Sequence, residues 1–139
     1  MIKTTTAVFE RPQHGTVTTK HIEGSIVESC YTGYCSQAAV ASVLALTPEV
    51  LRDVPSTRWL LDLGGVSSFD AGCRVPGGEI LRLFREAGGD RFAVVVKSSA
   101  LRMTLAAVAF AARLPLKLFD NRMEALSFLR ERDARRSAA

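Results

Sequence analysis

The 139-residue chain is poor in cysteine and histidine, from which small proteins build cross-linked or metal-bound cores. It has Cys30, Cys35, Cys73, His14 and His21, and their spacing does not match the paired ligands of a zinc site. The odd number of cysteines argues against a disulfide framework, so we expect ordinary reduced thiols. We therefore expect neither a metal nor a cofactor, and a core held together by apolar packing.

Long apolar runs are also scarce. The longest, residues 101–118, is interrupted by Arg102, Arg113 and Lys117 and is too short to cross a bilayer. The first residues lack the apolar segment of a signal peptide, so we expect a cytoplasmic protein without membrane insertion.

The charge of the chain is moderate, with a net value of +4. The last ten residues carry four arginines against two acidic residues, and the few aromatic residues of the chain lie mostly inside apolar runs elsewhere. Nucleic-acid-binding surfaces usually combine basic with aromatic side chains. We therefore interpret residues 133–139 as a short basic tail and expect no nucleic-acid partner.

Common catalytic motifs are missing as well. The sequence contains no G-x-S-x-G, no P-loop and no H-E-x-x-H. Cys73 lies in a glycine-containing loop and has the chemistry of a nucleophile, but the sequence identifies no base for it. We predict that the protein is not an enzyme.

Apolar residues make up 47% of the chain and charged residues 23%, as in an average soluble domain, which excludes disorder. Thr- and Val-rich stretches at 4–9 and 16–27 predict a hairpin, after which helices and strands alternate. The predicted helices are 34–46, ended by Pro48, then 76–87, 100–112 and 121–132, and the predicted strands are 58–63, 91–97 and 115–119. This order predicts one α/β domain over residues 1–132, with a mixed, mostly parallel sheet of about five strands flanked by about four helices.

The predicted helix 100–112 has two apolar flanks separated by a narrow polar stripe. The first flank contains Leu101, Leu105, Val108 and Ala112, and the second contains Met103, Ala107 and Phe110. One flank must face the sheet, so the other needs a cover. The final helix, predicted to bury Met123 together with Leu126, is one candidate, and a second subunit, a protein partner or an apolar ligand are the others.

Four short motifs follow one another between residues 55 and 130. They are Asp62-Leu63-x-x-Val66 leading to Phe69-Asp70, Gly88-Gly89-x-Arg91-Phe92, Ser98-Ser99-Ala100-Leu101-Arg102, and Phe119-Asp120 with Glu124-Ala125-Leu126. In this order and spacing they resemble the STAS family of SpoIIAA-like anti-sigma-factor antagonists, and especially its STAS/SEC14-like bacterial branch. The resemblance implies a bacterial regulatory protein whose partner is a regulatory kinase or an anti-sigma-like protein, with a homodimer as a further option.

The loop after strand 58–63 departs from the family pattern. Phospho-regulated members have Ser or Thr directly after the loop Asp, whereas here Ala71 and Gly72 follow Asp70, and neither has a hydroxyl group. Our hypothesis is a non-catalytic regulatory or scaffold module that docks on a protein partner without a phosphorylation switch. Its candidate partner-binding residues are Ser67, Ser68, Phe69, Asp70, Ala71, Gly72 and Arg74.

The two acidic residues of this region have structural interpretations too. Asp70 is placed to cap the helix that follows, besides its possible contact with a partner. Asp62, inside an apolar strand, is expected to accept hydrogen bonds from nearby loop amides, because an unpaired buried carboxylate is costly.

An alternative function is that of a SEC14-like carrier for an apolar or anionic small ligand. In that case Met103 and Phe110 would line a cavity, with Lys97 or Arg102 at its mouth. The candidate ligand-binding residues are Lys97, Ser98, Ser99, Arg102, Met103 and Phe110.

Overall fold

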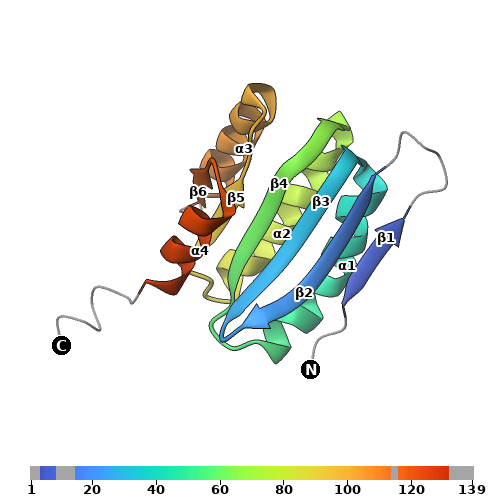
Figure 1. Cartoon of the computed structure of the whole chain (residues 1–139). Coiled ribbons are helices and arrows are strands. Elements are labelled where there is room, and N and C mark those ends of the chain that lie inside the picture. Colours follow the sequence, from blue (N-terminus) through green and yellow to red (C-terminus); the bar gives the residue numbers. More distant parts are fainter. Residues whose placement is uncertain (1–3, 9–14, 114–115, 132–139) are drawn as a thin grey trace.

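The computed structural model describes residues 4–8, 15–113 and 116–131. They form a six-stranded sheet in the order β1-β2-β3-β4-β5-β6, so that strands adjacent in the sequence are adjacent in the sheet (Figure 1). The first three strands run antiparallel to one another, and β3, β4, β5 and β6 run parallel. The strands are β1 Thr5–Val8, β2 Thr16–Glu23, β3 Ile26–Cys35, β4 Arg58–Phe69, β5 Phe92–Val95 and β6 Leu116–Phe119.

Four α-helices and one short 3₁₀ helix connect or follow the strands, which confirms the predicted α/β class. They are α1 Gln37–Asp53, η1 Ala71–Cys73, α2 Arg74–Glu86, α3 Ser99–Ala112 and α4 Arg122–Arg130. The predicted basic tail and part of the first predicted strand lie outside the described residues.

Several predicted boundaries are wrong. The helix predicted from residue 34 begins at Gln37, because the residues up to Cys35 belong to β3. The stretch 16–27 is two strands, because Gly24, with φ +48°, turns the chain between β2 and β3. Pro48 lies inside α1 and does not end it, since the helix continues to Asp53 and buries Val50 completely. The strand 58–63 continues to Phe69, since the residues after Gly64 remain paired with β3.

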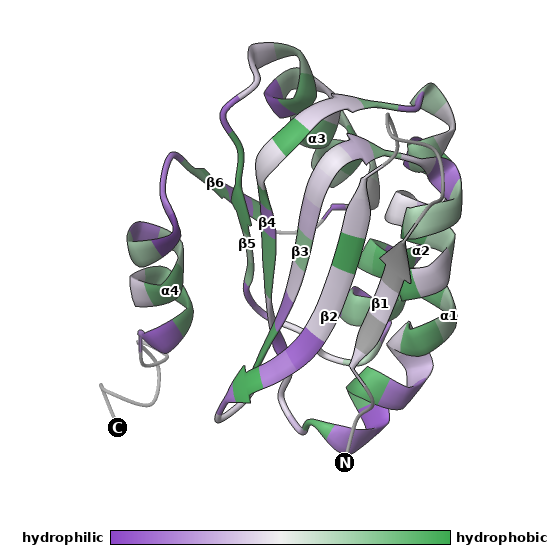
Figure 2. Ribbon diagram, turned by 45° about the vertical axis from the view of Figure 1, so that its right-hand side comes forward, coloured by the Kyte–Doolittle hydropathy of each residue, from purple (hydrophilic) through white to green (hydrophobic). Residues whose placement is uncertain are grey.

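The helices divide unequally between the two faces of the sheet (Figure 2). Helices α1, α2 and α3 cover one face and bury a large core around Trp59, Phe84 and Phe92. Helix α4 lies on the opposite face, over a smaller cluster that contains Leu60 and Leu129. Successive residues of β4 therefore serve different cores, as the alternation of side chains along a strand requires.

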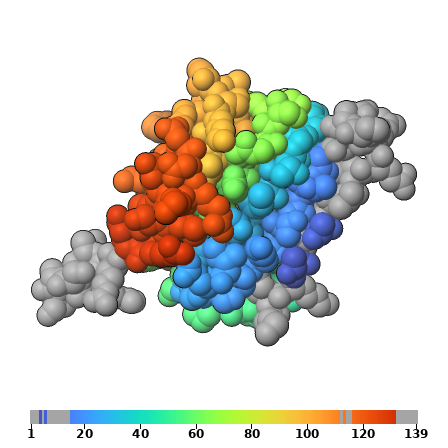
Figure 3. Space-filling model, viewed as in Figure 1, coloured from blue at the N-terminus to red at the C-terminus, as the bar shows by residue number. Residues whose placement is uncertain are grey.

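This division corrects two expectations about the helices. The final helix does not cover the second flank of α3, because the two helices lie on opposite faces of the sheet. Met123 is not buried but 82% exposed, since α4 turns Ala125, Leu126 and Leu129 toward the sheet. Beside α4, strands β2 and β3 reach the molecular surface on the same face (Figure 3).

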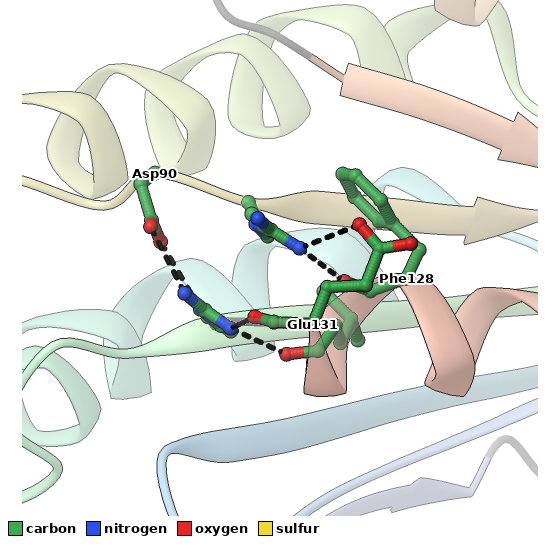
Figure 4. Close-up of polar contacts among 6 residues, drawn as sticks. Asp90, Phe128 and Glu131 are labelled. Atoms are coloured by element: carbon green, nitrogen blue, oxygen red, sulfur yellow. Dashed lines mark hydrogen bonds and ion pairs between the residues drawn. The ribbon is translucent and has the colours of Figure 1, made fainter. Parts of the chain in front are cut away.

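Two arginines of the sheet hold the carboxyl end of α4 (Figure 4). Arg58 donates hydrogen bonds to the carbonyl oxygens of Leu129 and Glu131, both at 2.7 Å, and forms an ion pair with Asp90. Arg91 donates to the carbonyl oxygen of Phe128 at 2.6 Å and to the Glu131 carboxylate at 3.1 Å. These contacts satisfy carbonyl groups that the end of a helix leaves without partners.

Candidate functional site

The candidate site lies where β4 extends beyond its neighbour. Strand β5 pairs with β4 over Trp59–Asp62 and ends at Val95, whereas β4 continues along β3 as far as Phe69. The projecting end of β4 leads directly into η1 and α2. Since ligands of open α/β sheets usually bind outside the carboxyl ends of the strands, this is the expected edge for a site.

Asp70 fixes the chain at this edge. Its Oδ1 accepts a hydrogen bond from the Gly72 amide at 2.9 Å, which confirms the predicted capping role. Its amide donates to the carbonyl oxygen of Cys35 at 2.9 Å, and its carbonyl oxygen accepts from the amide of Cys73 at 3.0 Å. Asp62 likewise accepts from the Gly64 amide at 2.9 Å, as predicted.

The sequence-predicted partner-binding residues are all those from Ser67 to Arg74 except Cys73, and we call this whole stretch the 67–74 segment. Ser67, Ser68, Ala71 and Arg74 are exposed. Phe69 differs from the expectation of a freely accessible contact residue, because its half-buried side chain packs against the large core. Gly72 is half-buried beside the Gln37 amide group, which occupies the space that a Cβ at position 72 would need.

Cys73, within the 67–74 segment, lies next to a second cysteine, Cys35. Cys35, at the end of β3, and Cys73, at the end of η1, have their Sγ atoms 4.0 Å apart, and the Cys73 thiol lies 3.3 Å from the Cys35 carbonyl oxygen. The hydrogen bond between the two sulfur groups lowers the pKa of Cys73 and, together with burial, raises that of Cys35. Sequence reasoning missed this pair, because 38 positions separate its members and only the pairing of Cys35 with Phe69 brings them together.

A largely apolar cavity of about 100 Å³ lies between the sheet and helices α1, α2 and α3. Its lining includes Tyr31, Leu63, Phe69, Ile80, Leu105 and Val108, together with Cys35, Cys73 and Arg74. Burial raises the pKa of Tyr31 well above its ordinary value, so its hydroxyl group stays neutral. Such a lining suits an apolar molecule of a few carbon atoms better than an ion.

The structure does not gather the alternative ligand-binding residues around this cavity. Helix α3 presents its first flank to the cavity, and Met103 and Phe110 are 75% and 87% exposed on the surface. The Ser98 hydroxyl caps α3 by accepting from the Leu101 amide at 3.2 Å. Arg102 forms an ion pair with Asp120 at 2.9 Å. Lys97 and Ser99 are exposed and do not belong to the lining.

Within the described ranges 4–8, 15–113 and 116–131, no three His, Cys, Asp or Glu side chains are grouped so that they could hold a metal ion. No helix in these ranges has the length and apolar character needed to cross a membrane.

Comparison with known proteins connects this geometry to a known fold. No family model matches the sequence, and no curated protein matches it either. Among solved structures, the anti-sigma factor antagonist SpoIIAA in its unphosphorylated form is similar, with a TM-score of 0.68 and 14% identity over 84% of this chain and 99% of that one. An anti-sigma factor antagonist from Mycobacterium paratuberculosis has a TM-score of 0.64 and 18% identity, over 88% of this chain and 100% of its own.

A third similar structure is an uncharacterized protein from Shewanella loihica with a SpoIIAA-like fold. Its TM-score is 0.60 at 12% identity, over 88% of this chain and 99% of that one. These three similarities confirm the fold that the four sequence motifs predicted.

Proposed function

We propose that this chain, which has the STAS/SpoIIAA-like fold, is a bacterial regulatory or scaffold module that docks on a protein partner through its 67–74 segment. Similar structures are those of anti-sigma factor antagonists, so the partner we propose is a regulatory kinase or an anti-sigma-like protein. The observation that carries the proposal is a surface of exposed residues held in place by the hydrogen bonds of Asp70. A segment that is already ordered loses little conformational entropy on binding.

Docking in this proposal does not depend on phosphorylation of the segment. Ala71 occupies the exposed first position of η1, directly after the capping carboxylate, and Gly72 lies against Gln37. Neither residue has an oxygen atom in its side chain that could accept a phosphoryl group. The module would therefore remain competent to bind under conditions that switch a phospho-regulated protein off.

The surroundings of Cys73 support a binding role rather than catalysis. Its sulfur atom lies beside Cys35 and close to Asp70, and the Asp70 carboxylate is engaged with the Gly72 amide. His21, the histidine among the described residues, lies on β2 and contacts the Gly24 carbonyl oxygen. The described neighbourhood therefore offers Cys73 no imidazole base.

Calorimetric titration with purified anti-sigma-like proteins and regulatory kinases of the source organism tests the proposal. At least one should bind, and Ala71→Glu should weaken its binding at least tenfold, because it places bulk and charge in the middle of the docking surface. Ala45→Glu, at an exposed alanine of α1, is the matched control and should leave the affinity unchanged. Absence of binding across the panel, or equal affinity of both variants, would contradict docking through this segment.

A second candidate function, a small-molecule carrier, is favoured by the cavity beneath the segment. Native mass spectrometry of protein purified gently from its own host should then show a bound apolar molecule, and it also reports the number of subunits. Leu105→Phe should displace the molecule, because Leu105 lines the cavity, whereas Met103→Phe on the exposed flank should retain it. A spectrum of ligand-free protein alone would count against the carrier.

A further inference from the structure

The thiols of Cys35, at the end of β3, and of Cys73, at the end of η1, lie next to each other. Their Sγ atoms are 4.0 Å apart, and a disulfide bond requires about 2 Å. The backbones that carry them are already joined, because the amide of Asp70 donates to the carbonyl oxygen of Cys35. Closing the remaining gap of roughly 2 Å therefore needs an adjustment of the side chains and of η1, without rearrangement of the sheet.

We propose that Cys35 and Cys73 are a modification site, which hydrogen peroxide converts into an intramolecular disulfide. The sulfur of Cys73 attacks one peroxide oxygen, the O–O bond breaks, and a sulfenic acid and one water form. The sulfur of Cys35 then attacks the sulfur of Cys73, and the hydroxyl group leaves as a second water. Two thiols and one peroxide give one disulfide and two waters, with two electrons passing from sulfur to oxygen.

The exposure and the pKa values of the two cysteines both favour oxidation of Cys73 before Cys35 reacts. Both cysteines line the cavity, and Cys73 is the less buried of the two, so a small uncharged oxidant reaches it first. The lowered pKa of Cys73 favours its thiolate, the form that peroxide oxidises, whereas the pKa of Cys35 is raised, so Cys73 is the first of the two to react.

The third cysteine provides a control on the same strand. Cys30 lies near Glu28, Asp62 and Arg122 on the side of the sheet that α4 covers in part, whereas Cys35 belongs to the core on the other side. The sheet therefore separates Cys30 from Cys73. Burial and the nearby carboxylates raise the pKa of Cys30, which makes it a poorer target for peroxide than Cys73, whose pKa is lowered.

The disulfide would regulate docking, a consequence that rests on the proposed function. Cys73 belongs to the 67–74 segment, and bond formation draws η1 toward the end of β3. The exposed Ala71 and Arg74 move with it, so we expect the oxidised protein to bind its partner at least fivefold more weakly. In disulfide-poor cytoplasm, transient bonds of this kind are typical of redox sensing.

Peroxide treatment of the full-length protein, followed by alkylation, intact-mass measurement and peptide mapping, tests the site without any partner. The unmodified sequence and Cys30→Ser should both lose two hydrogen atoms in mass and yield a linked pair of Cys35 and Cys73 peptides, and dithiothreitol should reverse the change. Cys73→Ser and Cys35→Ala should gain oxygen atoms instead. Thermal unfolding curves of the reduced variants show that each is folded before oxidation.

Three results would overturn the inference: a bond through Cys30, a bond between two chains, or oxygen addition to the unmodified sequence without loss of hydrogen. Titration of a binding partner with reduced and oxidised protein then tests regulation separately. If the disulfide forms but the affinity does not change, the modification site stands and its regulatory consequence is wrong. If no partner binds the reduced protein, the proposed docking function fails and the mass result is unaffected.

Discussion

Asp70 holds the 67–74 segment in place, together with the pairing of Ser68 and Phe69 with β3. Asp70 caps η1 with its side chain and ties the segment to β3 with its main chain, so the exposed residues on either side share a fixed frame. The hydrogen bond of its side chain to the Gly72 amide is local, which explains why a pattern of neighbouring residues was enough to predict the cap. The same residue sets the position of Ala71, the first residue of η1, whose side chain has no hydroxyl group.

The capping role of Asp70 can be separated from its charge. Asp70→Ala should lower the free energy of unfolding by about 1 kcal/mol, because the Gly72 amide loses its acceptor. Asp70→Asn keeps an oxygen in the capping position and should cost less than half as much. Urea denaturation measures both, and equal losses for the two variants would show that charge, not capping, is what stabilises the segment.

The three thiols should differ in their reaction with iodoacetamide as the pH changes. Because its pKa is lowered, Cys73 keeps a reactive thiolate to lower pH than an ordinary cysteine, whereas Cys30 and Cys35, with raised pKa values, become reactive only at higher pH. Peptide mapping at neutral pH should find Cys73 labelled first. Cys35→Ala removes the hydrogen bond and should shift the Cys73 profile to higher pH; an unmoved profile would refute that cause.

At the scale of the elements, sequence patterns predicted the order of helices and strands but not where each one ends. Caps such as Ser98 and Asn121 were predictable, because each depends on an amide three residues away. The full length of β4 was not, since the pairing of Gly65 with Thr32 is a contact between distant segments. The cavity lies between α3 and the sheet, whereas the carrier hypothesis placed it on the outer flank of α3, and Met103 and Phe110 were therefore wrongly predicted to line it.

Two glycines, one inside α2 and one just after it, allow the cost of a steric clash to be compared with the gain in helix propensity when glycine is replaced by alanine. A Cβ at Gly89 would overlap the ring of Phe84, which is completely buried and cannot yield. Gly89→Ala should therefore lower the free energy of unfolding by roughly 1–3 kcal/mol. Gly78→Ala, inside α2 with free space around it, should raise that energy by about 0.5–1 kcal/mol. Chemical denaturation decides, and a loss at both sites would mean that free space near Gly78 is not available.

At the scale of the whole molecule, the sheet is covered asymmetrically. Three helices and a large core occupy one face, while α4 occupies part of the other and relies on a small cluster and two arginines. Helix-period patterns cannot show which face a helix will cover, and α4 was therefore paired with α3 in our expectation. The face that α4 covers depends on how the chain leaves β6, and a pattern of neighbouring residues does not contain that information.

The attachment of α4 should depend on Arg58 and Arg91. Replacing either by Ala removes hydrogen bonds from a charged donor, which are worth about 1.5–3 kcal/mol, and should increase amide hydrogen exchange in α4 at least tenfold. Arg82→Ala, which breaks exposed ion pairs on α2, should leave that exchange unchanged. Faster exchange over the entire chain would instead indicate global destabilisation.

The strictly sequential strand order affects how the protein is made. Each new strand pairs with the one synthesised before it, so the sheet can grow in step with translation, and no strand waits for a partner still inside the ribosome. Helix α4 is the exception, because its Arg122 and Arg130 pair with Glu28 and Glu23 near the start of the sheet. The docking of α4 therefore joins the end of the described chain to β2 and β3, the strands near its start.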